Sequence, residues 1–374
     1  MQSLGCRACV RAAARRALSS ESPLRRLLRD AGARGEAPGA GELRWATTPY
    51  ADRAAPPTAA PQDAAVLLFP GQGAQFVGMG RRLQQTPAAR DLYDLASSIV
   101  GWDVWRVCTA GPAAELERRV QVCVLSTALA ALERAREERP GAVERVRAAA
   151  GFSLGELGAL VFAGALSLDA ALRLAQLREA AMRAAAAERA GGMLTVWLAP
   201  DARLGALLAA ARERARGPEL PEPVCEVANY LFPGCKVLAG DERALRAVEA
   251  EGRAWGVRRS ARVRVVGAFH CALMARAEAA VREALRALPV GAPRVRVVSC
   301  VDARSVRGAE GARRRLARLT AAPVRWEQTL HALYARPRGA PQPLTLALGP
   351  GGALRATLKL VNARAWDASL QIDV

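Results

Sequence analysis

The sequence contains few of the residues and patterns that several common protein classes need. It has two histidines and eight cysteines, and its one Cys-x-x-Cys pair, Cys6 and Cys9, has no second Cys or His pair at zinc spacing, so the usual zinc patterns are incomplete and the cysteines are too sparse for a disulfide scaffold. No run of eighteen uncharged apolar residues occurs, so we expect no membrane insertion. The low histidine count also means that any histidine base must be His270 or His331.

Acidic residues are also in short supply. The 374 residues carry a formal net charge of +19, and all but two of the 54 basic residues are arginine. A non-enzymatic RNA-binding protein is one reading of this charge, but that function needs a basic cluster with interleaved aromatic residues. The arginines are spread along the chain and aromatic residues make up only 5%. We therefore expect no nucleic-acid partner, although the charge should attract acidic proteins in a salt-dependent way.

The first 63 residues differ in composition from the rest. In residues 1–50, arginines alternate with Ala, Leu and Ser, and the first acidic residue is Glu21. This composition, without a continuous apolar segment, is typical of a mitochondrial presequence; a disordered basic tail is the alternative. Residues 51–63 form a Pro/Ala-rich linker. We therefore expect a protein of the mitochondrial matrix whose folded part begins at residue 64.

The remaining sequence alternates strand and helix patterns, which indicates an α/β fold. The apolar run 66–69, stopped by Pro70-Gly71, is typical of a buried parallel strand, and a second strand should end at Gly151. Long helical patterns are expected at 82–98, 113–137 and 168–189.

Residues 192–264 have a different order of elements. The patterns predict strand, helix, two strands, helix and a last strand at 261–266, which is the ferredoxin-like arrangement. We therefore expect a small ferredoxin-like subdomain over 192–264. It would be inserted into a large, hydrolase-like subdomain with a parallel sheet, formed by 64–191 and 265–374.

Two glycine-rich turns could carry chemistry. Residues 151–155 (GFSLG) fit G-x-S-x-G, in which a strand–turn–helix exposes a serine, here Ser153, at a helix N-terminus. The pattern alone is weak, because an ordinary loop serine also fits it. Residues 69–75 (FPGQGAQ) lack the ending of a phosphate loop and any dinucleotide fingerprint. They could instead place a backbone amide beside Ser153 to complete an oxyanion hole.

The two turns and a third motif, GAFH at 267–270, resemble the malonyl-CoA:acyl carrier protein transacylase family in order and spacing. The match extends over 64–360, and the segments 224–240 and 326–329 are similar to its animal mitochondrial members. The resemblance implies transfer of malonyl from malonyl-CoA to the phosphopantetheine thiol of acyl carrier protein, through a malonyl-serine. It implies no cofactor and no metal, and a role in mitochondrial fatty acid synthesis.

The resemblance also assigns the catalytic residues. Ser153 would be the nucleophile and His270 its general base, and the amides of Gln72 and Leu154 would bind the oxyanion. In this family a backbone carbonyl rather than a carboxylate orients the histidine. The matching position is Leu319, where many members have glutamine.

Substrate binding follows by the same resemblance. Arg178 would hold the free malonyl carboxylate, since a planar guanidinium binds it bidentately and stays charged when desolvated. Arg173 and Arg183 lie on the same expected helix and could be mistaken for it. The further substrate-binding positions are Gln121, Phe269 and Asn229.

A serine hydrolase of the G-x-S-x-G type, such as a lipase, is the alternative enzyme. It would normally use a catalytic aspartate and release its product to water. A carboxylate beside His270 would favour that class.

Overall fold

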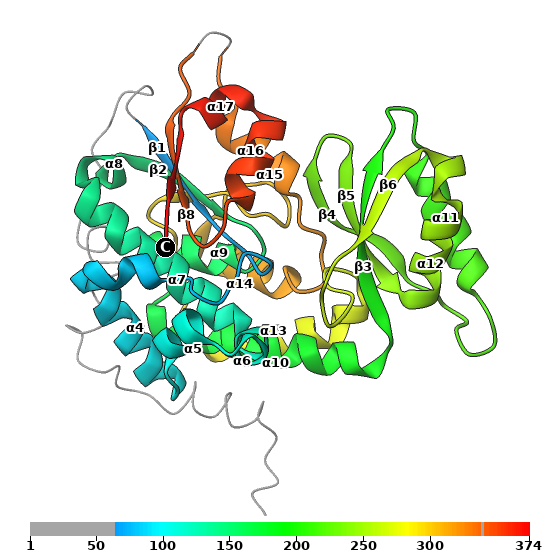
Figure 1. Cartoon of the computed structure of the whole chain (residues 1–374), viewed down its shortest axis with the longest axis horizontal. Helices are drawn as coiled ribbons and strands as arrows, with labels where there is room; N and C mark the ends of the chain where they lie inside the picture. The colour runs from blue at the N-terminus through cyan, green and yellow to red at the C-terminus, as the bar shows by residue number, and fades with distance from the viewer. Residues whose placement is uncertain (1–63, 338–339) are drawn as a thin grey trace, which may run out of the picture.

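The computed structural model describes residues 64–337 and 340–374, so the expected presequence (1–50) and linker (51–63) lie outside the described residues. The described chain forms a large parallel sheet covered by helices and a smaller antiparallel sheet beside it (Figure 1). This confirms the expected fold class. Within the described ranges, no helix is both long enough and apolar enough to cross a membrane.

The large sheet has five strands, and each neighbouring pair is parallel. In order they are β7 (Arg296–Val297), β2 (Val146–Gly151), β1 (Ala65–Phe69), β8 (Leu344–Leu348) and β9 (Ser369–Ile372). Successive side chains of β1 point to opposite faces, so Leu67 and Phe69 enter one hydrophobic core and Val66 and Leu68 the other. Burial on both faces explains why β1 is a continuous apolar run.

Helices supply the rest of both cores. One core is completed by α4 (Pro87–Val100), α5 (Val104–Ala110), α6 (Ala113–Arg118), α7 (Val120–Glu138), α8 (Pro140–Glu144), α9 (Gly155–Phe162), α10 (Leu168–Glu188), α13 (Ala275–Ala287) and α14 (Gly308–Arg318). The other is completed by α15 (Trp326–Tyr334), α16 (Ala353–Val361) and α17 (Ala363–Asp367). The described residues also form the short 3-10 helices η2 (Arg81–Gln85), η3 (Gly252–Trp255) and η4 (Ala272–Met274).

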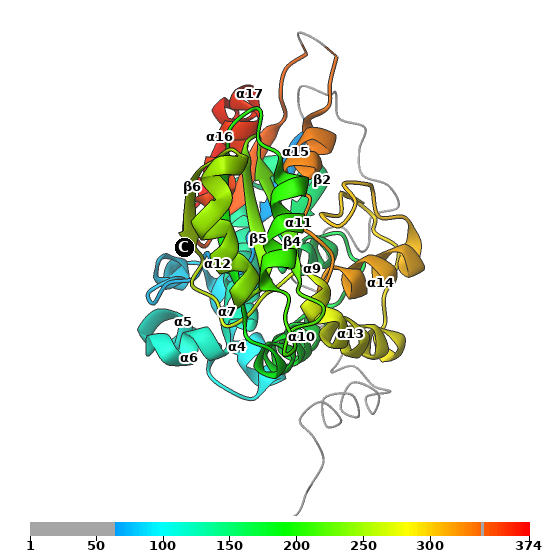
Figure 2. The same cartoon turned by 90° about the vertical axis from the view of Figure 1, so that its right-hand side faces the viewer.

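The small sheet has the ferredoxin-like chain order that we expected. Its strands are β4 (Cys225–Phe232), β5 (Cys235–Asp241), β3 (Gly191–Leu198) and β6 (Val257–Arg262), all antiparallel to their neighbours. Helices α11 (Leu204–Ala215) and α12 (Glu242–Glu251) complete the core on one face, and they lie toward the viewer in Figure 2. The division of the chain at residues 192 and 264 stays a prediction.

Several expected elements are displaced or divided. The last strand of the small sheet is Val257–Arg262, not 261–266; Val263 and Val265 are half-buried in the wall of a cavity instead of lying in a strand, and Val266 is exposed. The helix expected at 82–98 is interrupted at Thr86, because Pro87 disfavours helical backbone in the residue before it. The helix expected at 113–137 is interrupted at Arg119.

Segment 322–325 joins the two sheets. The Val324 amide donates to the Ala228 carbonyl of β4, and the Val324 carbonyl accepts from the Tyr230 amide, both at 2.8 Å. A largely buried ion pair between Lys236 of β5 and Glu327 of α15, at 2.7 Å, is a second link between the small sheet and the large subdomain. The edge strand β4 is therefore held against the large subdomain.

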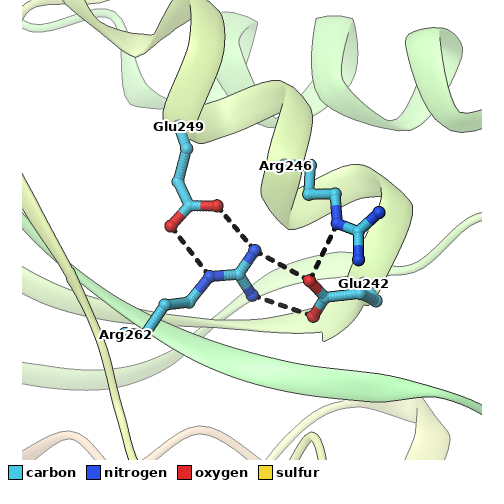
Figure 3. Close-up of polar contacts among 4 residues, drawn as sticks. All are labelled: Glu242, Arg246, Glu249 and Arg262. Carbon is cyan, nitrogen blue, oxygen red and sulfur yellow. Dashed lines mark hydrogen bonds and ion pairs between the residues drawn. The ribbon is translucent and has the colours of Figure 1, made fainter.

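Two arginine networks hold the other ends of the small sheet. Arg189, just after α10, makes a bidentate pair with buried Asp241, which also accepts from the Val224 amide at 2.6 Å. Arg262, the last residue of β6, lies between Glu242 and Glu249 of α12 (Figure 3). These contacts fix the points where the chain enters the small sheet from α10 and leaves it after β6.

Replacing Asp241 with Ala should lower the free energy of unfolding by about 2–3 kcal/mol. The change leaves the Val224 amide and the Arg189 guanidinium without their acceptor, and partial exposure of Arg189 keeps the loss below that of a fully buried pair. Urea denaturation measures the change. The control is Asp373→Ala, which breaks an exposed pair with Arg82 and should have little effect. Equal losses in the two variants would contradict the assignment.

Candidate active site

The G-x-S-x-G turn follows β2 at the carboxyl edge of the large sheet. Phe69 of β1 is paired with Gly151 of β2, and the Phe152 amide donates to the Phe69 carbonyl at 3.0 Å. The two glycine-rich loops therefore leave the sheet side by side. A Cβ on Gly151 would lie 1.8 Å from the backbone of Gly155, which explains the need for glycine at that position. Ser153 has φ 50°, the strained left-handed conformation that turns its hydroxyl toward the cavity.

His270 completes a hydrogen-bonded pair with this serine. It lies between β6 and η4, also in the left-handed region with φ 60°, and its Nε2 is 2.9 Å from Ser153 Oγ. Its Nδ1 is 3.2 Å from the carbonyl oxygen of Ala322. Because a carbonyl can only accept, Nδ1 carries the proton and Nε2 presents its lone pair to the serine hydroxyl. This hydrogen bond therefore goes to Ala322, three residues after the implied acceptor Leu319, whose carbonyl has a smaller effect on the ring.

The surroundings of His270 keep its ring neutral. Burial, and next the positive charge of Arg178, lower the pKa of His270 to about 3, against the smaller opposing effect of the Ala322 and Leu319 carbonyls. The imidazole is therefore unprotonated near neutral pH. It can accept a proton from Ser153 without first losing one.

Arg178 brings a buried positive charge to the nucleophile. It comes from the middle of α10, is only 4% exposed, and donates from Nη2 to Ser153 Oγ at 3.0 Å. Its Nη1 donates to Gln121 Oε1 at 2.8 Å, and Gln121 in turn lies against Met182. Burial lowers the pKa of Arg178 to about 10, so it remains charged at neutral pH. Within the described ranges it has no carboxylate ion-pair partner.

Its neighbours on α10 are placed differently. Arg173 pairs with Asp169 one turn earlier on the same helix, at 2.9 Å. Arg183 donates to the backbone carbonyl of Glu117 and lies 3.7 Å from Glu179. Of these three arginines, only Arg178 reaches the serine.

Two adjoining cavities lie at this site, and the inner one opens on the Ser153–His270 pair. An inner cavity of about 120 Å³ contains Ser153, His270, Arg178 and Asn229 in its walls. An outer pocket of about 460 Å³ is lined by Gln121, Glu117, Glu179 and Arg183, among others. The residues common to both are Gln72, Met182, Arg264, Val265 and Phe269. A ligand could therefore extend from the solvent side of the outer pocket to the serine.

Known proteins provide the context for this geometry. The acyl transferase domain family matches residues 66–340. A probable mitochondrial malonyl-CoA-acyl carrier protein transacylase of Drosophila melanogaster is 42% identical over 318 residues, which cover 84% of each chain. The mitochondrial malonyl-CoA-acyl carrier protein transacylase of Homo sapiens is 40% identical over 351 residues, covering 93% of this chain and 86% of that protein. The chain belongs to the malonyl-CoA-acyl carrier protein transacylase family.

Solved structures agree with this membership. A malonyl-CoA:acyl carrier protein transacylase from Xanthomonas oryzae is 30% identical, with a TM-score of 0.75 over 85% of this chain and 96% of that one. A malonyl-transacylase in complex with its type II PKS acyl-carrier protein is also 30% identical. Its TM-score is 0.72, over 81% of this chain and 94% of that one. The comparisons thus confirm the family that the three motifs indicated, and the similarity extends over most of the described chain.

The remaining site residues expected from the transacylase family lie at the same place. The amides of Gln72 and Leu154 have no hydrogen-bond acceptor within the described part of the chain, so both are available to an oxyanion. Phe269 is buried and lines both cavities. The Asn229 amide oxygen is buried without a partner among the described residues and belongs to the wall of the inner cavity. Their roles stay proposals.

The transacylase site also contains residues that the sequence did not indicate. Met182, Met193 and Val237 line the inner cavity but are ordinary apolar residues of a helix and two strands. The Ala322 carbonyl carries no side-chain signal at all. Glu156 directly follows the G-x-S-x-G motif, and its complete burial could have been suspected from that position alone.

The low pKa of His270 makes a prediction about acid stability. The unfolded chain binds a proton on this histidine below about pH 6.5, whereas the folded chain binds it only near pH 3. Stability should therefore fall as the pH drops from 6.5 toward 3, by about 2–3 kcal/mol at pH 4.5. His270→Gln should remove this contribution. The measurement is urea denaturation of both proteins at pH 7 and pH 4.5, and a constant difference between them would contradict the neutral, buried histidine.

Proposed function

We propose that this chain transfers the malonyl group of malonyl-CoA to the phosphopantetheine thiol of acyl carrier protein through an ester on Ser153. The observation that carries the proposal is the position of Arg178. Its buried guanidinium reaches the oxygen of a serine that is paired with a neutral histidine. A nucleophile beside an unpaired buried cation suits an acyl group that has a second, free carboxylate.

In the first half-reaction, His270 Nε2 accepts the hydroxyl proton as Ser153 Oγ attacks the thioester carbonyl carbon. The Gln72 and Leu154 amides bind the oxyanion, and each such donor is worth about 3 kcal/mol in related chemistry. When the tetrahedral intermediate collapses, the carbon–sulfur bond breaks and the histidine returns its proton to the CoA thiolate. A malonyl-serine ester remains.

In the second half-reaction, the pantetheine thiol of acyl carrier protein enters through the outer pocket. His270 removes the thiol proton, the sulfur attacks the ester, and Ser153 leaves with that proton. Arg178 holds the malonyl carboxylate in both halves, with Gln121 fixing the guanidinium from the other side. Asn229 and Phe269 complete the wall around the short acyl group.

The partner of His270 supports a transferase over the hydrolase alternative. Its Nδ1 contacts backbone carbonyl oxygen, where a hydrolase triad would place an aspartate. We also propose that the positive charge of the chain steers the acidic acyl carrier protein to the outer pocket.

The chain is a mitochondrial protein, since relatives at 40% and 42% identity over most of its length carry that location in their names. We place it in the matrix, where it would serve mitochondrial fatty acid synthesis. The arginine-rich, acid-poor composition of residues 1–50 supports a presequence that directs it there.

Brief exposure to malonyl-CoA should add one malonyl group to the protein, and peptide mapping should find it on Ser153. Ser153→Ala should abolish loading while the melting temperature stays near that of the wild type. The measurement is intact-protein mass with and without the acceptor thiol. Persistent loading of Ser153→Ala, or a malonyl group on a cysteine such as Cys271, would exclude the serine mechanism.

Replacing Arg178 with Ala should lower kcat/KM for malonyl-CoA on the order of a hundred- to a thousandfold. The change leaves the substrate carboxylate unpaired in a buried site, which costs about 3–5 kcal/mol. Acetyl-CoA has no carboxylate, so its kcat/KM should fall far less. The measured quantity is the malonyl-to-acetyl ratio of kcat/KM.

Arg173→Ala, on the same helix but paired with Asp169, is the matched control and should leave the ratio unchanged. A ratio that responds to Arg173 and not to Arg178 would reverse the assignment.

A reporter fused to residues 1–50 should be imported into the mitochondrial matrix. A second fusion, with the arginines of that segment replaced by glutamine, should remain outside because import requires the positive charge. Fractionation with protease protection distinguishes matrix from intermembrane space. A cytosolic reporter would refute the presequence and leave the proposed chemistry untouched.

A further inference from the structure

Glu156 is a fully buried carboxylate that the proposed chemistry does not use. It lies three residues after the nucleophile, in the first turn of α9. Its Oε2 accepts two hydrogen bonds, from Ser299 Oγ at 3.1 Å and from the Cys300 amide at 2.9 Å. Its Oε1 has no partner among the described residues. Both donors belong to the segment that follows β7, the edge strand beside β2.

A carboxylate at this position is costly for stability. Burial raises the pKa of Glu156, the largest of the effects on it, and the two hydrogen bonds only partly offset that effect. Its second oxygen, Oε1, also has no hydrogen-bond donor among the described residues. An apolar side chain of similar size would avoid both costs. The contacts of Ser299 and Cys300 indicate a positioning role that could explain why a carboxylate occurs here despite its cost in stability.

The Cys300 peptide connects Glu156 to the acceptor of the histidine. The Cys300 carbonyl accepts from the Arg325 amide at 2.7 Å, and Arg325 lies three residues beyond Ala322, which accepts from His270 Nδ1. The thiol of Cys300 lies on the other side, next to the backbone of Ser153. Segment 299–300 therefore contacts both the turn that carries Ser153 and segment 322–325, the strap whose Ala322 carbonyl orients His270.

The same strap supports the inner cavity. Val324, adjacent to Arg325, pairs with Ala228 and Tyr230 of β4, the residues on either side of Asn229. A shift of the strap would therefore move the Ala322 carbonyl, which accepts from His270, together with the part of the cavity wall that contains Asn229. A displacement of about 1 Å among reacting groups can cost on the order of a hundredfold in rate.

We propose that Glu156 is a positioning residue that clamps segment 299–300 to the nucleophile's helix and so sets the geometry of the Ser153–His270 pair. The reaction whose rate it affects is the malonyl transfer proposed above. The clamp itself is independent of the substrate, so it can be tested by a measurement that needs no acyl-CoA.

The first test is the rate of Ser153 loading by malonyl-CoA in single-turnover experiments on the full chain. Glu156→Leu removes the acceptor at similar size and should slow loading on the order of a hundredfold, mainly in the limiting rate and little in the half-saturating concentration. Glu156→Gln keeps an acceptor for both donors and should stay within about threefold of the wild type. Ser299→Ala removes one donor and should slow loading by about fivefold.

The second test is ¹⁵N-histidine NMR, which is simple here because the chain has only two histidines. His331→Gln assigns the spectrum. The wild type and Glu156→Gln should show His270 in the Nδ1–H form, and Glu156→Leu should show a mixture of the two neutral forms with a moved ring-proton signal. Glu133→Leu is the matched control. Glu133 is another buried glutamate, paired with Arg136 on α7, and its loss should lower the melting temperature without changing the His270 signals.

The outcomes separate the two proposals. A wild type that is not loaded by malonyl-CoA would refute the proposed function, while the His270 spectra would still decide on the clamp. Unchanged spectra and loading in Glu156→Leu, or the same spectral change in Glu133→Leu, would overturn the clamp. If Glu156→Leu does not fold, Ser299→Ala decides: wild-type loading and spectra in that variant would also overturn it.

Discussion

The 2.9 Å hydrogen bond between Ser153 and His270 joins residues 117 positions apart, both in a left-handed backbone conformation that is unfavourable for a side chain larger than glycine. Such strain persists only where the surrounding structure holds it. Ser153 is held by the close packing of the turn after β2, where glycines let two backbones approach. His270 is held by the strap at 322–325, which pairs with β4. The fold around the site is largely the set of contacts that keeps these two conformations in place.

Charge explains why this pair is ready to react. A buried arginine beside a histidine makes the protonated ring unfavourable, so the base is neutral before substrate arrives. The same arginine lacks a carboxylate among the described residues, although many arginines elsewhere have one within a turn of helix. Binding an anionic acyl group would offset the positive charge of Arg178. That change would also ease proton transfer to His270 during attack, because its imidazolium form would be less strongly repelled.

The sequence allowed prediction of those parts of the site that depend on side chains in fixed local patterns. The two glycine-rich turns and GAFH indicated Ser153 and His270, and the family resemblance pointed to Arg178. The parallel order of strands could be expected because β1 is apolar on both faces. Backbone groups could not be predicted in the same way. The Ala322 carbonyl is an acceptor by its position, which any residue could provide, so the register of the strap needed the structure.

The sequence pattern also predicted the position of β6 incorrectly, at 261–266 instead of Val257–Arg262. The valines at 263–266 suggested a strand, but Val263 and Val265 are half-buried in the cavity wall and Val266 is exposed, after the strand has ended at Arg262. Burial produces the same alternation whether the covering surface is a sheet partner or a ligand pocket. The ion-pair network of Arg262 with α12 stops the strand where the chain must turn toward His270. In this family member, the small subdomain therefore does more than cover the cavity: through β6 on one side and β4 on the other, it fixes both the histidine and the carbonyl that orients it.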